Sequence, residues 1–180
     1  MISISERERS KYEKAWALEG YGASPGMRYL DMFWGIAKPP QNASLIDIGC
    51  GDGQAGKALR DRGLLVCGFD LVGSESGLPI YTGTVWRDLL DGPFDYGYCC
   101  DVMEHIPTQF TALSIDSILR SCSFAFFAIN FELDRHGDAI RDRLHLTVQP
   151  FTWWRDMMRE LGTVHEARDL LGNGVFYVER

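Results

Sequence analysis

Apolar runs alternate with helix-like patterns along most of the chain. Two helices are predicted before residue 40: one over residues 6–18, with Tyr12 and Trp16 four positions apart, and one that begins at Ser24 and Pro25. Short buried strands follow, separated by further helices. The predicted strands cover residues 44–48, 64–69, 80–82, 96–101, 124–131, 164–168 and 175–179. The helices between them are predicted to start after the glycine-rich turn that follows residue 48, at Pro107 and at Thr152, which is expected to cap its helix.

Strands that alternate with helices predict an α/β fold. We expect a three-layer sandwich whose doubly wound, mostly parallel sheet of seven strands is covered by helices on both faces. The last two strands are joined by residues 171–174, which are too few for a helical crossover. The last strand is therefore expected to run antiparallel.

Composition and charge exclude several classes of protein. The 180 residues include 18 Lys+Arg and 25 Asp+Glu, for a formal net charge of −7. This charge disfavours duplex nucleic acid as a partner, because such binding depends on Lys and Arg that neutralise phosphates. No apolar run is long enough to cross a bilayer, and the charged amino terminus lacks the apolar core of a secretory signal. We therefore expect a cytoplasmic protein with no membrane partner.

The cysteines predict reduced core thiols. They are five in number and show no C-x-x-C spacing. Cys99 and Cys100 are adjacent, so on a strand they point to opposite faces and cannot jointly bind a metal. No metal site is expected.

A glycine-rich turn follows the first predicted strand. Residues 45–53 read Leu-Ile-Asp-Ile-Gly-Cys-Gly-Asp-Gly, and Asp70 ends the next strand. Glycines let the backbone approach a ligand closely, and the helix that follows points its N–H groups at the same place. An acid at the end of the second strand can accept both hydroxyls of a ribose. These features predict a nucleoside site.

The same turn also fits a dinucleotide site. Residues 51–56 match G-x-G-x-x-G, the dinucleotide fingerprint. Asp47 and Asp52 flank the turn, however, and carboxylates disfavour a pyrophosphate and favour a cationic ligand. Gly49 rather than Gly51 directly follows the strand, so the match starts one turn too late. A nicotinamide-dependent oxidoreductase is the less favoured alternative.

The chain resembles the class I S-adenosylmethionine (SAM)-dependent methyltransferases, which have a Rossmann-like sheet of seven strands. The resemblance rests on residues 47–53, on Asp70, on the closing antiparallel pair and on residues 94–106, which contain the sequence Asp-Val-Met-Glu-His. It implies that residues 41–180 form a SAM-binding catalytic domain and that residues 1–40 form a helical cap or lid. The implied reaction is methyl transfer from SAM, with S-adenosylhomocysteine as product.

The resemblance also assigns cofactor-binding residues. The backbone at Gly49 and Gly51 passes under the methionine part of SAM, with Asp47 near its ammonium group. Asp70 holds the ribose, and Asp101 faces the methionine and sulfonium end. The complete implied set is Asp47, Gly49, Cys50, Gly51, Asp70 and Leu71, then Trp86 and Asp88 beside the adenine with Asp88 accepting from its amine, and finally Asp101 and Val102 after the fourth strand.

Three residues are candidates for acid–base chemistry at the methyl acceptor. Methyl transfer mainly requires alignment of the nucleophile and exclusion of water, so a base is not obligatory. His145 lies after the fifth strand, where family members commonly border the acceptor, and it is a candidate base or a surface histidine. Glu104 and His105 follow the fourth strand. Their alternatives are a helix-dipole interaction for Glu104 and a packed or capping role for His105.

Aromatic residues and the end of the fifth strand are candidates for the cavity wall. Residues 130–132 can line a pocket, and Trp153 lies off the apolar face of its helix. Tyr12, Trp16 and Tyr21 can form a lid over cofactor and acceptor, and core packing is the alternative for these aromatic residues.

The absence of certain motifs restricts the class of methyl acceptor. The chain has neither N-P-P-Y nor D-P-P-Y after the fourth strand, which disfavours methylation of DNA amino groups, and no Pro-Cys nucleophile for cytosine C5. We expect a small-molecule acceptor methylated at an O, N or C atom. The alternatives are a protein methyltransferase and a SAM-binding or SAM-degrading protein without methyl transfer.

Overall fold

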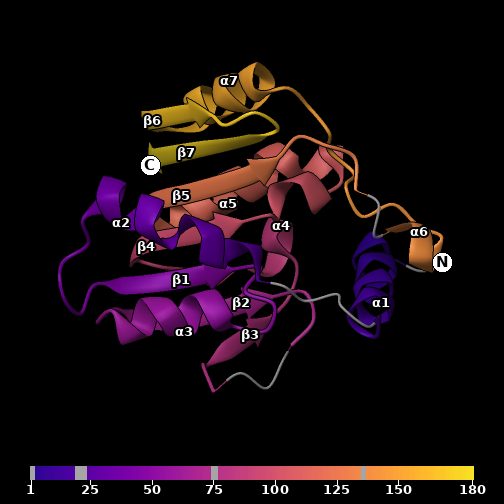
Figure 1. Cartoon of the computed structure of the whole chain (residues 1–180), viewed down its shortest axis with the longest axis horizontal. Coiled ribbons are helices and arrows are strands. Elements are labelled where there is room, and N and C mark those ends of the chain that lie inside the picture. The colour runs from indigo at the N-terminus through magenta and orange to yellow at the C-terminus, as the bar shows by residue number, and fades with distance from the viewer. Residues whose placement is uncertain (1–2, 19–23, 74–76, 135–136) are drawn as a thin grey trace.

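A seven-stranded sheet forms the centre of the molecule (Figure 1). The computed structural model describes residues 3–18, 24–73, 77–134 and 137–180. The strands lie in the order β3-β2-β1-β4-β5-β7-β6. Their bounds are β1 Ser44–Ile48, β2 Leu65–Asp70, β3 Ile80–Thr82, β4 Phe94–Cys100, β5 Cys122–Asn130, β6 Thr163–Asp169 and β7 Asn173–Glu179.

The strand directions confirm the predicted mixed sheet. Strands β1 to β5 pair in parallel with one another. Strand β7 is antiparallel to both of its neighbours, β5 and β6. A short turn joins β6 to β7, and the Leu170 N–H closes it by donating to the Asn173 carbonyl over 2.8 Å. The final strand therefore enters the sheet between β5 and β6 and runs against them.

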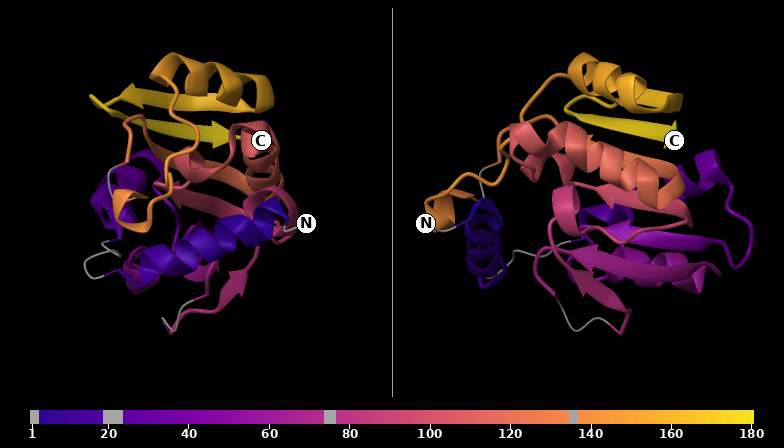
Figure 2. Two further views of the ribbon diagram at one scale, coloured as in Figure 1. Left: turned by 90° about the vertical axis from the view of Figure 1, so that its right-hand side faces the viewer. Right: turned by 180° about the vertical axis from the view of Figure 1, so that it is seen from behind.

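Helices cover both faces of the sheet (Figure 2). One face packs against α2 and α3, whose buried Phe33 and Leu59 join the first of two apolar clusters. The other face packs against α4, α5 and α7, with Ile115 and Trp154 in the second cluster. The α-helices are α1 Ile4–Trp16, α2 Leu30–Ala37, α3 Gln54–Asp61, α4 Val85–Asp88, α5 Thr111–Ser121, α6 Gly137–Ile140 and α7 Phe151–Leu161.

Proline determines where two helices begin, and both starts differ from prediction. Pro107 is followed by a 3-10 turn, η3 Thr108–Phe110, so α5 begins only at Thr111. Helix α7 begins one residue before Thr152, because the extended Pro150 is its N-cap and its carbonyl accepts from the Trp153 N–H over 3.0 Å. The prediction that Thr152 caps this helix is wrong.

The described part of the first 40 residues divides between two places. Helix α1 lies beside α6 at the carboxyl ends of the parallel strands, away from the layers of the sandwich (Figures 1 and 2). The 3-10 helix η1 (Pro25–Tyr29) and α2 instead pack on the sheet, with Tyr29, Leu30 and Phe33 buried in its first cluster. Only α1 has the position of a cap. Among the described helices, none combines the length and apolar character needed to cross a membrane.

Candidate active site

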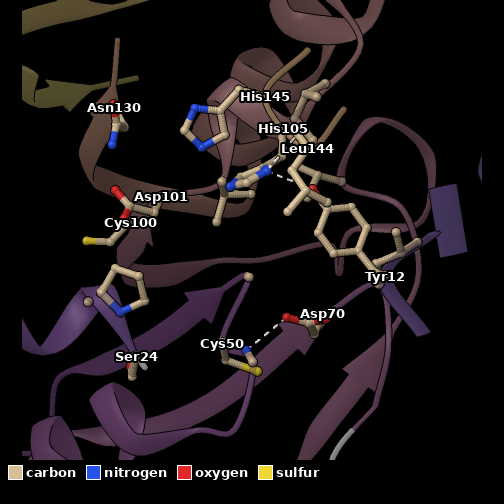
Figure 3. A pocket seen from close by; sticks show the side chains of 18 of the residues that line it. Tyr12, Ser24, Cys50, Asp70, Cys100, Asp101, His105, Asn130, Leu144 and His145 are labelled. Atoms are coloured by element: carbon tan, nitrogen blue, oxygen red, sulfur yellow. Dashed lines mark hydrogen bonds between the residues drawn. The ribbon is translucent and has the colours of Figure 1, made fainter. Parts of the chain in front are cut away.

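A cavity of about 1100 Å³ opens at the carboxyl ends of β1, β2, β4 and β5. This is where ligands bind in open α/β sheets, because β1 and β4 are adjacent but their connections leave in opposite directions. The volume is slightly larger than the ~300–1000 Å³ of pockets that hold one small ligand, so a nucleoside and a second molecule fit together. Figure 3 shows part of the wall of this cavity, with Asp70 and Cys50 at one end and His105 and His145 at the other.

The glycine turn forms one end of the cavity and needs its glycines. Gly49 and Gly51 have φ angles of +70° and +53°, in the left-handed region that side chains disfavour. A Cβ atom at Gly49 would overlap the Val102 side chain, and one at Gly51 would lie 3.0 Å from the Trp16 ring. The bare backbone thus forms a floor between β4 and α1. The predicted residues Gly49, Cys50, Gly51, Leu71 and Val102 all line the cavity.

Two carboxylates, the buried Asp47 and the partly buried Asp70, support this floor. Asp70 accepts from the Gly51 N–H over 2.8 Å and from the Val72 N–H over 2.9 Å. Burial raises the pKa of Asp70. Asp47 is 3% exposed, and among the described residues its Oδ2 atom has no hydrogen-bond partner. Burial, and after it the charge of Asp70, raises the pKa of Asp47 to about 7.

Asp101 ends β4 in an unusual backbone conformation. Its φ angle is +52°, which is uncommon for a residue with a side chain and is typical of functional sites. Its Oδ1 atom is buried without a hydrogen-bond partner among the described residues. Burial raises the pKa of Asp101, and the positive charge of Arg28 opposes the rise. Asp101 therefore stands between the amino-terminal segment and His145.

The segment after β3 differs in part from expectation. Trp86 lines the cavity, and its ring stacks on Phe110 with centroids 5.0 Å apart and planes 5° apart. Asp88 does not line the cavity. Its Oδ2 atom instead accepts from the Thr84 N–H over 2.9 Å and the Thr84 hydroxyl over 2.8 Å, and it pairs with Arg87. The Asp88 carboxylate thus caps the single turn of α4 from within.

His145 is oriented by a backbone carbonyl. Its Nδ1 atom lies 2.6 Å from the Glu132 carbonyl oxygen. A carbonyl oxygen only accepts, so Nδ1 carries the hydrogen and Nε2 of the neutral ring keeps its lone pair. His145 lines the cavity, and its role as a general base stays a prediction.

His105 lies between His145 and α1. Its Nδ1 atom is 2.7 Å from the Tyr12 hydroxyl and 3.2 Å from the Leu144 carbonyl, and its ring meets the His145 ring edge-on with centroids 4.6 Å apart. Burial, and then the nearby His145, lowers the pKa of His105 to about 3. The ring is therefore neutral at ordinary pH and is a weak base. These contacts favour the packed role over the catalytic one.

Glu104 lies behind the cavity wall and not on it. It is fully buried in the 3-10 turn η2 (Met103–His105), and its Oε1 accepts from the Asn130 N–H over 2.9 Å. Its backbone carbonyl accepts from Leu146 and Thr147. Burial, and then the charge of Asp101, raises the pKa of Glu104 well above its usual range. Glu104 thus ties the ends of β4 and β5 to the segment that carries His145.

Glu104, His105 and His145 also form a group of metal-ligand types. One ligand atom from each lies within 4.8 Å of the others. The expectation of no metal site rested on the cysteines, and this group contains none of them; its members come from two distant segments.

Helix α1 closes the cavity from the side. Tyr12 and Trp16 both line it, as the lid hypothesis requires. Lys11 is buried, donates to the Arg143 carbonyl over 2.9 Å and forms an ion pair with Glu8. Tyr21 lies outside the described residues. Trp153 does not line the cavity and packs partly buried on the second apolar cluster.

The structure adds lining residues that the sequence pattern did not reveal. Arg28 lies on η1, a five-residue turn too short to show a helical period. Ser24 precedes it, and Glu8 sits on α1 among many other charges. Of the proposed lining from the end of β5, Asn130 and Glu132 reach the cavity and Phe131 does not. A charged residue in a short turn or a charge-rich helix carries no sequence signal that separates it from a solvated surface.

Comparison with known proteins gives one similar curated sequence and many similar structures. No protein-family model matches the chain. The ubiquinone biosynthesis O-methyltransferase of Chromobacterium violaceum is 32% identical over 93 residues, which span 44% of this chain and 38% of that protein. The match therefore spans well under half of that relative.

Three solved structures illustrate the likeness in fold. The 1,6-didemethyltoxoflavin-N1-methyltransferase of Burkholderia thailandensis, solved with S-adenosylhomocysteine, has a TM-score of 0.73 at 15% identity, over 98% of this chain and 87% of that one. The N-methyltransferase NodS of Bradyrhizobium japonicum, also with S-adenosylhomocysteine, has a TM-score of 0.71 at 11% identity, over 96% and 98%. The magnesium protoporphyrin IX methyltransferase of Synechocystis has a TM-score of 0.63 at 14% identity, over 100% and 89%. The expected class I methyltransferase fold is confirmed.

Proposed function

We propose that this chain is a SAM-dependent methyltransferase that methylates an O, N or C atom of a small molecule. The observation that carries the proposal is the cavity at the ends of β1 and β4, where buried carboxylate oxygens of Asp47 and Asp101 lack partners. Unpaired buried carboxylates are costly unless a cationic ligand completes them. SAM carries an ammonium and a sulfonium group. The similar structures solved with S-adenosylhomocysteine support the same choice.

The residues of the turn fit SAM. Gly49 and Gly51 leave room for its methionine part, with Asp47 beneath the ammonium group. Asp70, already held by backbone N–H groups, accepts from the ribose hydroxyls. Arg28 lines the cavity close enough to Asp101 to affect its pKa, and we assign it to the carboxylate of the methionine part. We assign the adenine contact to Trp86 and none to Asp88.

SAM, when bound, supplies a methyl group on a sulfonium centre that leaves as a neutral thioether. The chain aligns the acceptor and keeps water out, which is most of the catalysis that such a displacement needs. The Nε2 atom of His145 takes the proton that an O–H or N–H acceptor loses. His105, Tyr12 and Glu104 are assigned to hold His145 and α1 in place. Residues 1–40 contribute the cap through α1.

The proposed acceptor is a small molecule because the cavity is closed on one side by α1. Tyr12 and Trp16 line that side, and their rings limit the room for an extended chain there. We also assign the protein to the cytoplasm. All five cysteines are free, which fits a reducing compartment.

Thermal unfolding with S-adenosylhomocysteine tests the cofactor site. At 100-fold over Kd a ligand stabilises by ~2.7 kcal/mol, which raises Tm by about 5–10 °C for a chain of this size. We expect that shift with S-adenosylhomocysteine and none with NAD. Asp70→Ala should abolish the shift, whereas Asp61→Ala on the exposed end of α3 should keep it. A shift with NAD alone would refute the proposal. Binding without methyl transfer to any acceptor of a broad panel would favour a SAM-binding protein instead.

A further inference from the structure

Three side chains of metal-ligand types meet at the end of the cavity opposite Asp70. Glu104 and His105 belong to η2, which follows β4, and His145 lies in the segment before α7. One ligand atom from each of the three lies within 4.8 Å of the others. Figure 3 shows the two histidine rings beside each other at this end, and their centroids are 4.6 Å apart. We call Glu104, His105 and His145 the Glu-His-His group.

The Glu104 carboxylate has one oxygen with a partner and one without. Its Oε1 atom accepts from the Asn130 N–H over 2.9 Å. Its Oε2 atom is buried and has no hydrogen-bond partner among the described residues, in a side chain that is fully buried. Such an oxygen is costly unless it is paired, and buried carboxylates are paired with cations or coordinate metals. Oε2 is therefore available to a cation, whereas Oε1 has a structural role.

Both histidine rings are oriented as they are in metal sites. The Nδ1 atom of His145 lies 2.6 Å from the Glu132 carbonyl oxygen, and that of His105 lies 3.2 Å from the Leu144 carbonyl oxygen. Because a carbonyl only accepts, we place the hydrogen of each ring on Nδ1, and the Tyr12 hydroxyl oxygen is a second acceptor for that of His105. Metal-binding histidines donate their other ring N–H to such partners, which fixes the ring and leaves the Nε2 lone pair for the ion.

The types of ligand atom identify the class of ion. Two imidazole nitrogens and one carboxylate oxygen suit Zn²⁺ and similar divalent transition metals, whereas Mg²⁺ and Ca²⁺ prefer oxygen ligands. A site with three protein ligands keeps a position open for another molecule. His105 and His145 line the cavity and Glu104 lies behind its wall, so the open position would face the cavity.

We propose that Oε2 of Glu104 and the Nε2 atoms of His105 and His145 bind a divalent transition-metal ion whose open position faces the cavity. This site goes beyond the proposed function, because ion binding requires neither SAM nor an acceptor. A hydroxyl group of an acceptor can occupy the open position, and the ion makes such an O–H more acidic, so that its proton leaves to water. An ion on Nε2 of His145 excludes a proton there, so His145 acts as the base only in the chain without the ion.

Co²⁺ tests the site by absorption, without turnover. We would treat the full chain with EDTA, remove the chelator and titrate Co²⁺. The visible bands of Co²⁺ should saturate at one ion per chain, and the near-ultraviolet absorption of a Co²⁺–thiolate bond should be absent although all five cysteines are free. Zn²⁺ should displace the Co²⁺, because nitrogen and oxygen sites bind Zn²⁺ more tightly, and millimolar Mg²⁺ should not.

Two variants assign the ion to its ligands. Glu104→Gln keeps an oxygen for the Asn130 N–H, and His145→Asn keeps an amide N–H for the Glu132 carbonyl. Each removes one ligand atom and should weaken Co²⁺ binding by more than the ~10–100-fold that is typical of a change to an outer partner of a metal site. The matched control is His165→Ala, which removes an exposed histidine of β6 outside the cavity and should leave Co²⁺ affinity unchanged.

Three results would overturn the inference: no Co²⁺ binding at millimolar concentration, binding that shows thiolate absorption, or an affinity that both variants retain. Far-UV circular dichroism checks that each variant is folded. His145 is only partly buried, so its variant decides the question if the buried Glu104→Gln does not fold.

Titration of S-adenosylhomocysteine into the same samples separates this inference from the proposed function. A parent chain that binds S-adenosylhomocysteine but no Co²⁺ loses the metal site alone. A parent chain that binds Co²⁺ but no S-adenosylhomocysteine keeps the metal site and loses the methyltransferase.

Discussion

Asp47 connects the protonation of one carboxyl group to ligand binding. Its pKa is raised to about 7 by burial and by the charge of Asp70, so it is about half protonated in the empty site at neutral pH. The ammonium group of a bound ligand favours the ionised form. Affinity for S-adenosylhomocysteine should therefore fall about tenfold from pH ~8 to pH ~6. Calorimetric titration across this range measures it, and Asp47→Asn should bind more weakly with a flatter profile.

The Asp47 carboxyl group also makes the stability of the protein depend on pH, and this dependence has the opposite sign to that of ligand affinity. A carboxyl group whose pKa is raised by folding stabilises the protein below its unfolded pKa of ~3.9, and that stabilisation is lost as pH rises through about 7. The free energy of unfolding of the ligand-free chain should thus decline between these values by more than in Asp47→Asn. Urea unfolding at several pH values gives the free energy of unfolding of the parent and of Asp47→Asn. Equal slopes of this free energy against pH would contradict a buried, ionisable Asp47.

His145 is the residue on which proton transfer is expected to depend. With Nδ1–H held by the Glu132 carbonyl, its Nε2 is free to accept a proton. We expect His145→Ala to lower kcat by ~10²–10⁴-fold for an O–H acceptor, which is the usual contribution of a general base. Its S-adenosylhomocysteine affinity should remain that of the parent. The measurement is the rate of single-turnover methyl transfer. It is made with and without EDTA, because Glu104, His105 and His145 together form a group of metal-ligand types.

The matched control for this experiment is the exposed His165. It lies on β6, pairs with Glu179 and does not line the cavity. His165→Ala should therefore retain the parent rate. If His145→Ala also retains it, alignment alone accounts for catalysis and no base is used.

At the scale of elements, η2 joins three parts of the molecule through Glu104. Its Oε1 satisfies the Asn130 N–H at the end of β5, and its carbonyl satisfies two N–H groups of the segment after Leu144. Glu104→Ala leaves the buried Asn130 N–H unpaired, which should cost about 1–3 kcal/mol in the free energy of unfolding. Glu104→Gln keeps the accepting oxygen, so its free energy of unfolding should fall by less. Urea unfolding gives both values, and equal losses would argue against this hydrogen bond.

The helices and strands that could be predicted from the sequence are those determined by a local residue pattern. The apolar run of β5 and the glycine turn after β1 are local signals, and the structure has both. The start of α7 was wrong, because Pro150 provides a backbone cap that a search for polar capping side chains overlooks. The contact of Asp88 with an adenine stays a prediction, and the structure shows only that the carboxylate, at the last residue of α4, accepts from Thr84 and does not line the cavity.

At the scale of the whole molecule, the cavity wall joins segments that are far apart in sequence. Tyr12 meets His105 across 93 positions, and the Lys11 side chain meets the Arg143 carbonyl across 132. The hydrophobic periodicity of a sequence does not indicate contacts between residues so far apart. Family resemblance suggested the glycine turn, Asp70 and the region of His145. The position of Glu104 behind the wall depends on how the ends of β4 and β5 pack against the segment that carries His145.

The two apolar clusters share one sheet, so the molecule should unfold as one unit. Phe126 and Phe127 are neighbours on β5, both fully buried, and they point into opposite clusters. Replacing either by Ala should cost about 3–5 kcal/mol, whereas Leu65→Ala at an exposed site of β2 should cost under about 0.5 kcal/mol. Because each cluster needs the strand that the other supports, each variant should still show a single transition. Far-UV circular dichroism and tryptophan fluorescence should then give the same midpoint. Separate midpoints in Phe126→Ala would mean that the α2 and α3 layer opens by itself, and the cofactor turn between β1 and α3 would open with it.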